Sequence, residues 1–519
     1  MTILDIIIFI AYGLVIIMIG NLLSRSSKNE RDSNSYFFAG NSLPWYLIGT
    51  SIIAANISAE QFIGMSGSGY AIGLGIATYE WIAALILIVV AKYFLPVLID
   101  NKIHTMPQFM EFRYDRRIKT ILAIFWISLF VMVNITSILY LGALTLKSLL
   151  DIPLVAAIIG LAMFTLMYSL FNGLKAIAST DIIQVVFLVA GGLLTTYLAL
   201  NAISNDGGLW EGFQMIKQQA PEKLHMVLHS SNPNYKYLPG VRAILGGIWI
   251  AGIYYFGANQ YIIQKALGAK NLKEAQRGMA FAAYLKLLLP LIVVVPGIAA
   301  FVLNADISGP DEAYPWLLTT FIPSGFKGFI FAALIAAIVS SLSAIINSTS
   351  TIFTMDIYKV YFNTQASERQ LVKTGRISGL VAMVIATCLA PLLGHVEQAF
   401  QFIQEYTGML SPGITAIFVF GLFWKKTTSN SALWGMVVSI VASVLLKFGF
   451  PDMPFLDNML VAFLITASFI ILWSLVEGRY HMNGKAIMVC RGAYRTGFVF
   501  NVAAVGIIVI LLALYISFW

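Results

Sequence analysis

Residues 51–73 read SIIAANISAEQFIGMSGSGYAIG, in a part of the chain where apolar neighbours on both sides predict a membrane-spanning helix. The stretch nevertheless contains Asn56, Ser58, Glu60 and Gln61, together with four glycines. Lipid offers no hydrogen-bond partners, so irregular backbone at membrane depth is tolerated only where protein or water surrounds it. The stretch therefore predicts a broken helix that lines an internal site.

The composition of the whole chain indicates an integral membrane protein. Its 519 residues are 59% hydrophobic and only 11% charged, whereas soluble domains contain roughly 25% charged residues. Apolar stretches long enough to cross a bilayer recur along the entire chain, and we expect about fourteen transmembrane helices from them. The predicted fold class is all-α and membrane-embedded, with no separate soluble domain.

The distribution of charge predicts the orientation of the helices. The net charge is +8, but the basic residues lie in alternate loops, so they indicate topology and not a nucleic-acid partner. The loop at 101–119 is strongly basic, whereas the loop at 303–315 is acidic. The positive-inside rule then places both termini outside the cytoplasmic (inner) membrane, although the basic loop 205–238 is an exception.

Cysteine and histidine give no sign of redox or metal chemistry. Cys388 lies in a predicted span and Cys490 in a loop, so a disulfide framework is not expected. The five histidines are scattered over loops and helix ends without a common face. We expect no organic cofactor and no enzymatic activity.

A second interrupted span, GGIWIAGIYYFGANQ, occupies residues 246–260. An odd number of spans separates it from the first, so the two enter the membrane from opposite sides, as an inverted repeat of five plus five helices requires. The repeats would occupy 44–204 and 239–424, with an extra helix at 4–24 and further helices at 431–518. Alternatively, the glycines of the second segment only allow close helix packing.

Unwinding of the first broken span would expose backbone carbonyl oxygens, and neutral oxygens of this kind bind hard cations such as Na⁺. A complete shell needs oxygens from a second span. The apolar span at 326–357 offers the adjacent hydroxyls of Ser340 and Ser341, with the Ala337 carbonyl one turn earlier. Close packing of small hydroxyl residues is an equal alternative for this helix.

Ionisable and amide side chains inside a membrane are functional candidates by default. Several spans contain them, at Glu60, Gln61, Glu80, Lys286 and Gln404, and aromatic residues lie nearby at Tyr79, Tyr255, Phe256 and Phe400. Such a cavity suits a polyhydroxylated solute, because hydroxyl groups take the hydrogen bonds and an aromatic ring covers the apolar face. A structural ion pair is an equal alternative for Lys286, and N-terminal capping of a helix is the alternative for Asp181.

Long stretches of the chain resemble the sodium/solute symporter family, and within it the bacterial sodium/glucose–galactose cotransporter branch. They include SLPWYLIGTSIIAANISAEQFIGMSGSGYAIGL at 42–74, FAALIAAIVSSLSAIINSTSTIFTMDIYK at 331–359 and QAFQFIQEYTGMLSPGI at 398–414. The resemblance implies a core of the leucine-transporter type, with five plus five inverted helices and two broken ones. It also implies that Na⁺ is the co-transported ion.

The resemblance implies an ion site made of neutral oxygens. Its implied ligands are the carbonyls of Ala54, Ile57 and Ala337 and the hydroxyls of Ser340 and Ser341. Asp181 matches a family position that helps the ion to leave toward the cytoplasm.

The resemblance also implies residues that bind the solute and close over it. The implied hydrogen-bonding groups are Gln61, Glu80, Lys286 and Gln404. Tyr255 would be the inner gate, stacked on the sugar ring, with Phe256 beside it. The outer side would be closed by Met65, Tyr79 and Phe400.

Three positions depart from the galactose-transporter pattern. Gly252 replaces a sugar-binding Asn, Ala83 replaces a binding Ser, and Phe256 replaces a Trp beside the gate tyrosine. Loss of a partner for a buried hydroxyl costs about 1–3 kcal/mol. Galactose itself is therefore not implied, and another hexose, an inositol-like polyol or a modified sugar fits equally well.

We predict a sodium-coupled secondary active symporter that imports a sugar or sugar-like polyol by alternating access. The alternatives are symport of another small solute, such as inositol, a nucleoside, a carboxylate or an amino acid, and a non-transporting solute sensor. A third is a membrane-embedded enzyme for a lipid-linked sugar. The sensor would need an output domain or a degraded ion site, and the enzyme would need a carboxylate cluster at the membrane surface; the sequence shows none of these.

Overall fold

The computed structural model describes residues 2–26, 33–58, 60–150, 152–169, 173–393, 399–478, 485, 487 and 492–519. These residues form helices, and an isolated bridge pairs Leu43 with Ala269. The predicted all-α class is therefore confirmed for the described part of the chain.

The helices divide into two series on either side of a connecting segment that carries α12 (Gly208–Gln219). The first series contains α1 (Ile3–Ser26), α2 (Ser33–Phe38), α3 (Trp45–Asn56), α4 (Ser66–Ala71), α5 (Thr78–Val89), α6 (Leu95–Asp100), α7 (Met106–Arg113), α8 (Arg116–Leu129), α9 (Thr136–Leu150), α10 (Leu154–Ser169) and α11 (Leu174–Ile203). The second contains α13 (Gly240–Leu245), α14 (Gly247–Ile253), α15 (Gln260–Leu267), α16 (Leu272–Val302), α17 (Ala313–Phe321), α18 (Phe326–Thr351), α19 (Glu368–Leu389), α20 (Ala399–Phe423), α21 (Ser429–Gly449), α22 (Phe455–Glu477) and α23 (Phe498–Ser517).

Shorter segments interrupt or extend these helices. The 3₁₀ turns are η1 (Ala39–Asn41), η3 (Leu74–Ala77), η6 (Pro221–Leu224), η7 (Pro233–Lys236), η9 (Pro310–Glu312) and η11 (Ala390–Leu393). The π segments are η2 (Glu60–Met65), η4 (Val90–Phe94), η5 (Phe130–Ile135), η8 (Tyr254–Ala258) and η10 (Ile352–Phe362). Widened turns of the π type occur often at functional sites, and η2 and η8 fall within the two interrupted spans.

Among the described residues, nine helices are long and apolar enough to cross a membrane, and a bent pair, Pro233–Leu245 with Gly247–Ala258, raises the number to ten. Three shorter apolar helices are Ile3–Val15, Leu154–Met167 and Thr407–Phe423. The multi-pass membrane architecture is thus confirmed, while the exact number of crossings stays a prediction.

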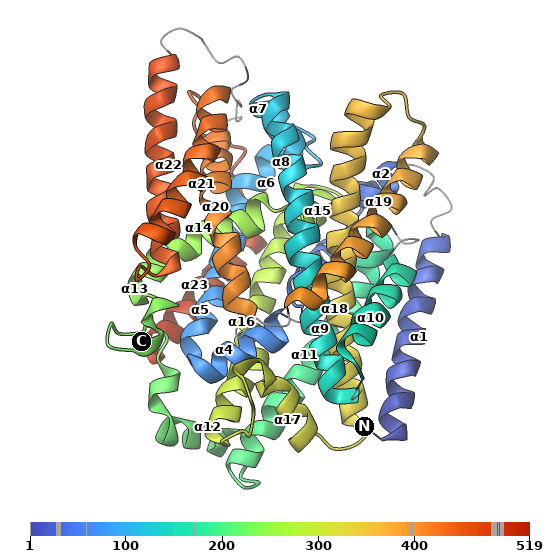
Figure 1. The fold of residues 1–519 in the computed structure, drawn as a ribbon, viewed down its shortest axis with the longest axis vertical. Helices are drawn as coiled ribbons and strands as arrows, with labels where there is room; N and C mark the ends of the chain where they lie inside the picture. The colour runs from blue at the N-terminus through green and yellow to red at the C-terminus, as the bar shows by residue number, and fades with distance from the viewer. Residues whose placement is uncertain are drawn as a thin grey trace.

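The centre of the molecule is formed by α16 and α18 (Figure 1). Helix α16 packs against α3, α4 and α5, and α18 packs against α11 and α1. In the most apolar window of the span Phe326–Phe362, formed by α18 and η10, 94% of the residues are buried within the protein, compared with 17% in α23. Helix α18 is therefore shielded from lipid almost completely, so its polar side chains face protein.

The second interrupted span is broken more than once. Helices α13 and α14 meet at an angle of 76°, at Gly246, where a Cβ atom would lie 2.8 Å from Leu460 Cδ2 and 2.9 Å from the Arg242 carbonyl oxygen. A further interruption follows η8, because Asn259 has extended backbone angles (φ −81°, ψ 122°) before α15 begins. The expectation of a break in 246–260 is confirmed, but Gly252 lies inside the regular helix α14.

The contact of α16 with α4 tolerates no side chain at Gly297. A Cβ atom at this position would lie 2.0 Å from the Ser66 carbonyl oxygen. We expect Gly297→Ala to lower the free energy of unfolding by about 1–3 kcal/mol, because overpacking forces the two backbones apart. Thermal unfolding in detergent measures this effect.

Gly449→Ala is the matched control, since no atom lies within 4 Å of a Cβ atom at Gly449. Equal melting temperatures for the two variants would contradict the close packing of α16 against α4.

Candidate functional site

The first broken span opens because a side chain competes for a helical hydrogen bond. Helix α3 ends at Asn56, and Ile57 has extended angles (φ −78°, ψ 107°). The Ser58 N–H would continue the helix by donating to the Ala54 carbonyl, but it donates to Gln61 Oε1 at 3.0 Å instead. The Ser58 hydroxyl donates to the same oxygen at 3.1 Å. The Ala54 carbonyl is left without its helical partner.

The released carbonyls face α18. The Ser341 hydroxyl donates to the Ala54 carbonyl oxygen at 3.1 Å and to the Ile57 carbonyl oxygen at 3.2 Å. Ala337, one turn earlier on α18, and its neighbour Ser340 are also buried. Hard cations bind oxygens at roughly 2.3–2.6 Å, so oxygens 3.1–3.2 Å apart are close enough to share one ion. The residues implied for the ion site thus lie on two facing elements.

Asp181 lies beside this group, buried in α11. The Ser340 hydroxyl donates to Asp181 Oδ1 at 2.6 Å, and the Ser51 hydroxyl donates to Asp181 Oδ2. The Lys265 ammonium lies 3.7 Å from the same carboxylate. The alternative that Asp181 caps a helix N-terminus is wrong, because it lies about two turns inside α11, which begins at Leu174.

Ser51 and Lys265 were not foreseen as partners of this carboxylate. The Lys265 side chain is buried, with an exposed fraction of 1%. The sequence gives no sign of this burial, because Lys265 follows the end of a predicted span, where lysines usually lie in loops. Its burial follows from α15 packing against α3 and α18, which sequence spacing does not reveal.

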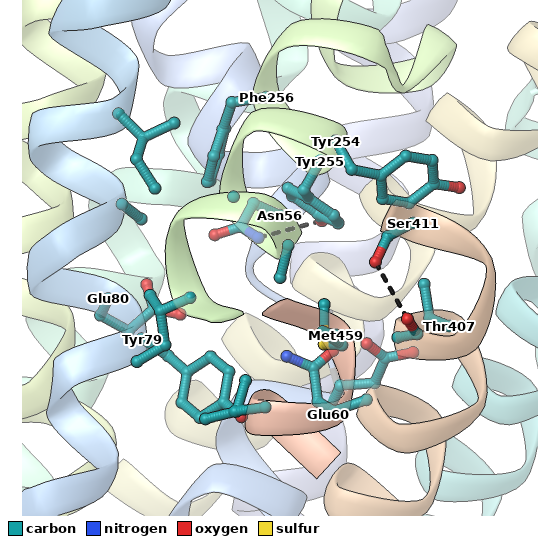
Figure 2. A pocket seen from close by; sticks show the side chains of 18 of the residues that line it. Asn56, Glu60, Tyr79, Glu80, Tyr254, Tyr255, Phe256, Thr407, Ser411 and Met459 are labelled. Atoms are coloured by element: carbon teal, nitrogen blue, oxygen red, sulfur yellow. Dashed lines mark hydrogen bonds between the residues drawn. The ribbon is translucent and has the colours of Figure 1, made fainter. Parts of the chain in front are cut away.

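A cavity between α3, η2, α5, α14, η8, α16, α20 and α22 collects the predicted solute-binding residues (Figure 2). Its lining includes Gln61, Glu80, Lys286, Gln404, Tyr255, Tyr79 and Phe256. Of the other gate residues, Met65 is fully buried but is not part of this lining, and the side chain of Phe400 lies outside the described residues.

The charged groups of the cavity form a buried pair. Lys286 Nζ donates to Glu80 Oε2, and both side chains are almost inaccessible to solvent. The Lys286 ammonium also lies 5.3 Å from the centre of the Phe256 ring. The ion-pair interpretation of Lys286 is therefore confirmed, and because Lys286 also lines the cavity, its contact with the solute stays a prediction. Another carboxylate of α20, Glu405, pairs with Lys447 at 3.0 Å.

Tyr255 connects the two broken spans. Its hydroxyl oxygen accepts hydrogen bonds from Asn56 Nδ2 at 3.0 Å and from the Tyr261 hydroxyl at 2.5 Å. Asn56 ends α3 and Tyr261 belongs to α15, beyond the break at Asn259. Figure 2 shows the Tyr255 and Asn56 side chains next to each other in the cavity. A displacement of the Tyr255 ring would therefore break hydrogen bonds to both broken spans.

The three departures from the galactose-transporter pattern all line the cavity, at Ala83, Gly252 and Phe256. At Gly252 a Cβ atom would lie 2.2 Å from Ile86 Cδ1. The Ile86 side chain therefore occupies the space into which a residue at position 252 would project. The wall is apolar at this point.

Several cavity residues were not predicted from the sequence. They are Thr407, Ser411, Phe455, Leu456 and Met459, whereas Asn56 and Glu60, which also line the cavity, belong to the stretch that was predicted to line an internal site. Glu60 accepts a hydrogen bond from the Ser137 hydroxyl at 3.1 Å. The α22 residues were missed because α22 was regarded as an addition to the core, although Gly408 on α20 allows it to approach: a Cβ atom there would lie 2.9 Å from Met459 Sδ.

Broken helices whose carbonyls face buried hydroxyls, next to a polar cavity inside a bundle of apolar helices, define an ion-coupled membrane transporter. The chain belongs to the sodium:solute symporter family, whose family model matches residues 36–439. It is accordingly a sodium-coupled symporter.

The relatives support the same assignment, one of them over nearly the full length of both chains. The chain is 50% identical to the sodium/glucose cotransporter of Vibrio parahaemolyticus, with 99% of this chain and 98% of the relative covered. It is 31% identical to the human sodium/myo-inositol cotransporter 2, with 84% of this chain and 68% of the relative covered.

Solved structures show the same fold. A Na⁺-coupled sialic acid symporter in a substrate-bound outward-open state superposes with a TM-score of 0.81 at 23% identity, covering 92% of this chain and 98% of that one. A nucleobase-cation-symport-1 family transporter superposes with a TM-score of 0.55 at 16% identity, covering 85% and 94%.

The buried Glu80–Lys286 pair generates a stability prediction. Lys286→Met leaves the Glu80 carboxylate buried without its partner, and we expect a loss of about 3–5 kcal/mol in the free energy of unfolding. The double variant Glu80→Gln/Lys286→Met should recover part of that loss, because no isolated charge remains. Chemical unfolding in detergent measures both.

Lys447→Met is the control, since its pair with Glu405 is partly exposed, with side-chain exposures of 27% and 40%. Pairs of that kind contribute about 0–1 kcal/mol. If Lys286→Met and Lys447→Met were equally stable, the Glu80–Lys286 pair would not be a buried one.

Proposed function

We propose that the protein imports a sugar or sugar-like polyol together with Na⁺, by alternating access. The observation that carries this proposal is that the first broken span contributes both to the proposed ion site and to the polar cavity. The Ala54 and Ile57 carbonyls meet the Ser341 hydroxyl, and Gln61 from the same segment lines the polar cavity.

We assign Na⁺ to the carbonyls of Ala54, Ile57 and Ala337 and the hydroxyls of Ser340 and Ser341. A hydroxyl that now donates to two carbonyls would turn its lone pair toward the ion, so the ion replaces those hydrogen bonds. Asp181, which already accepts from the Ser340 hydroxyl, would receive the ion as it leaves toward the cytoplasm. Its carboxylate also accepts a hydrogen bond from Ser51 on α3, so Asp181 contacts both helices next to the proposed ion site.

We attribute the coupling between ion binding and solute binding to Gln61. Its carbonyl oxygen holds the Ser58 N–H, which keeps the Ala54 carbonyl free for the ion. Its side chain also lines the solute cavity. Ion binding would order the segment that presents Gln61 to the solute, and the solute would strengthen ion binding by the same factor.

The solute assignment rests on the mixture of groups around the cavity. Gln61, Glu80, Lys286 and Gln404 provide donors and acceptors, and Tyr255 and Phe256 provide aromatic surface. Relatives named for glucose and myo-inositol transport are consistent with a polyhydroxylated ring. The Ile86 side chain against Gly252 favours a ring with an apolar edge at that wall.

We further propose that Tyr255, with Phe256 beside it, is the inner gate, and that Met65, Tyr79 and Phe400 close the outer side. The Tyr255 hydroxyl bonds to Asn56 and Tyr261, and these would have to break before the ring moves. The gate would thus open only together with a change in both broken spans.

The proposed architecture has about fourteen transmembrane helices, with a five-plus-five inverted repeat at 44–204 and 239–424 of the leucine-transporter type. The additional helices would be those at 4–24 and 431–518. The two stretches with π segments and extended residues, α3–η2 and α14–η8, support this proposal because each belongs to the first predicted span of its proposed half.

The proposed location is the cytoplasmic membrane, with both termini outside. Asp5 accepts hydrogen bonds from the Gly325 and Gly328 amides at 2.7 and 2.9 Å, and the Phe518 carbonyl accepts one from Met226 at 2.8 Å. Both contacts involve loops, those before α13 and before α18, that the alternation of the spans assigns to the extracytoplasmic side. In Figure 1, α12 and α17 lie at the end of the molecule that holds the N-terminus, and α7, from a basic loop, lies at the opposite end.

Uptake into liposomes tests the ion site. With an inward Na⁺ gradient and a panel of labelled sugars, polyols and amino acids, we expect sodium-dependent uptake of a sugar or polyol. Ser341→Ala removes one proposed ligand and should raise the half-saturating Na⁺ concentration at least tenfold, which corresponds to about 1.4 kcal/mol.

Ser343→Ala is the matched control on the same buried helix, since no partner is found among the described residues for the Ser343 hydroxyl. It should leave the Na⁺ dependence unchanged. Sodium-independent uptake would refute the coupling, and uptake of an amino acid or carboxylate in place of a sugar would refute the solute class.

The wall at Gly252 tests solute selection. Gly252→Asn alone should abolish uptake, because its side chain would collide with Ile86. The double variant Ile86→Ala/Gly252→Asn provides the space and adds a hydrogen-bonding amide, so we expect uptake to return with a preference, roughly tenfold, for solutes with an extra hydroxyl. Competition assays with matched deoxy and hydroxy sugars measure the preference, and an unchanged ranking would show that this wall does not contact the solute.

A further inference from the structure

A second cavity lies away from the solute site, between α1, α9, α10, α11 and α18. Its volume is about 390 Å³, whereas an apolar cavity of roughly 150 Å³ is enough to bind benzene. Its walls are mostly aliphatic and aromatic, with residues such as Phe9, Leu161 and Phe164. None of the lining residues that the structure describes is charged.

Two polar side chains interrupt this apolar wall. Gln184 is 1% exposed, and neither its amide nitrogen nor its amide oxygen has a hydrogen-bond partner among the described residues. The same holds for the hydroxyl of Tyr12 on the facing helix α1. Both residues line the cavity. An unsatisfied buried amide costs about 1–3 kcal/mol, so a ligand that bonded to Gln184 would relieve this cost.

The cavity lies beside surfaces that face lipid. Ile10 and Leu14 on α1 are 52% and 63% exposed, and Val155, Ile159 and Met163 on α10 are similarly exposed. These apolar surfaces are those expected to contact acyl chains. Gly160 of α10 lines the cavity, and a Cβ atom at this position would meet no atom within 4 Å. Entry from the bilayer is therefore the direct route for an apolar molecule.

From these observations we propose that this cavity, here called the α1–α10 cavity, binds an uncharged amphipathic membrane lipid with one hydroxyl or carbonyl group. The Gln184 amide and the Tyr12 hydroxyl hold the polar group, and the aliphatic and aromatic walls hold the chain. A phosphate or ammonium headgroup is excluded because no charged side chain in the described lining would compensate it.

The position of the site connects it to transport. Ala332, Ile335, Ala336 and Val339 of α18 line the cavity, and they lie on a different face of that helix from Ser341. Gln184 follows Asp181 by one turn of α11. The bound lipid therefore packs against the far side of α18, which carries proposed ion ligands, and against α11, which carries Asp181.

Photolabelling of the full-length protein tests this site. The probe is a diazirine-bearing long-chain alcohol added to purified protein in micelles, and its carboxylate and trimethylammonium analogues are the charged comparisons. We expect the alcohol to label peptides from α1, α10 or α11 specifically, and the charged analogues to label them at least tenfold less. Equal labelling by all three probes, or no saturable labelling by the alcohol, would overturn the proposal.

Two variants locate the binding. Gly160→Phe fills the cavity without a backbone collision, so labelling should be lost, whereas Gly449→Phe, at another glycine with open space, should retain it. Gln184→Met removes the polar group at similar volume and should weaken alcohol binding roughly three- to tenfold. Sodium-dependent uptake by each variant reports correct folding, and undiminished labelling of Gly160→Phe or of Gln184→Met would overturn the assignment.

Discussion

The structure depends on one diverted hydrogen bond. The Ser58 N–H turns from the α3 helix to the Gln61 side chain, which frees the Ala54 carbonyl to face Ser341 on α18. In hydrocarbon a free carbonyl would be prohibitively costly, so the surrounding helices must exclude lipid from this point. The near-complete burial of α18 meets that requirement. The group of oxygens proposed to bind the ion and the deep position of α18 therefore both depend on this opening.

The proposed solute cavity shows how a membrane protein accommodates charge. Glu80 and Lys286 neutralise each other within the cavity wall, and Asp181 is held by two serine hydroxyls and by Lys265. A buried charge without a partner is far more costly than a paired one. Because Glu80 and Lys286 together have no net charge, they can offer hydrogen-bonding groups that suit a neutral solute.

Much of the site could be predicted from residues whose chemistry is out of place in lipid. Glu80, Lys286 and the polar residues of 51–73 stand out because hydrocarbon penalises them, and the structure brings Gln61, Glu80 and Lys286 to one cavity. Lys265 and Met459 could not be predicted in this way. Lys265 resembles a loop lysine, and Met459 is an ordinary apolar residue of an ordinary span, so neither carries a local signal of its location.

By itself, the sequence determined the membrane class, the helical fold, the two interruptions and the family, because these depend on composition, apolar run length and residues that lipid rejects. Tertiary structure alone decided which distant groups meet. It paired Lys286 with Glu80, surrounded Asp181 with Ser51, Ser340 and Lys265, and placed Ile86 against Gly252. The physical reason is that helix packing is set by side-chain shapes over whole surfaces, whereas each span taken alone only requires enough apolar length to cross the bilayer.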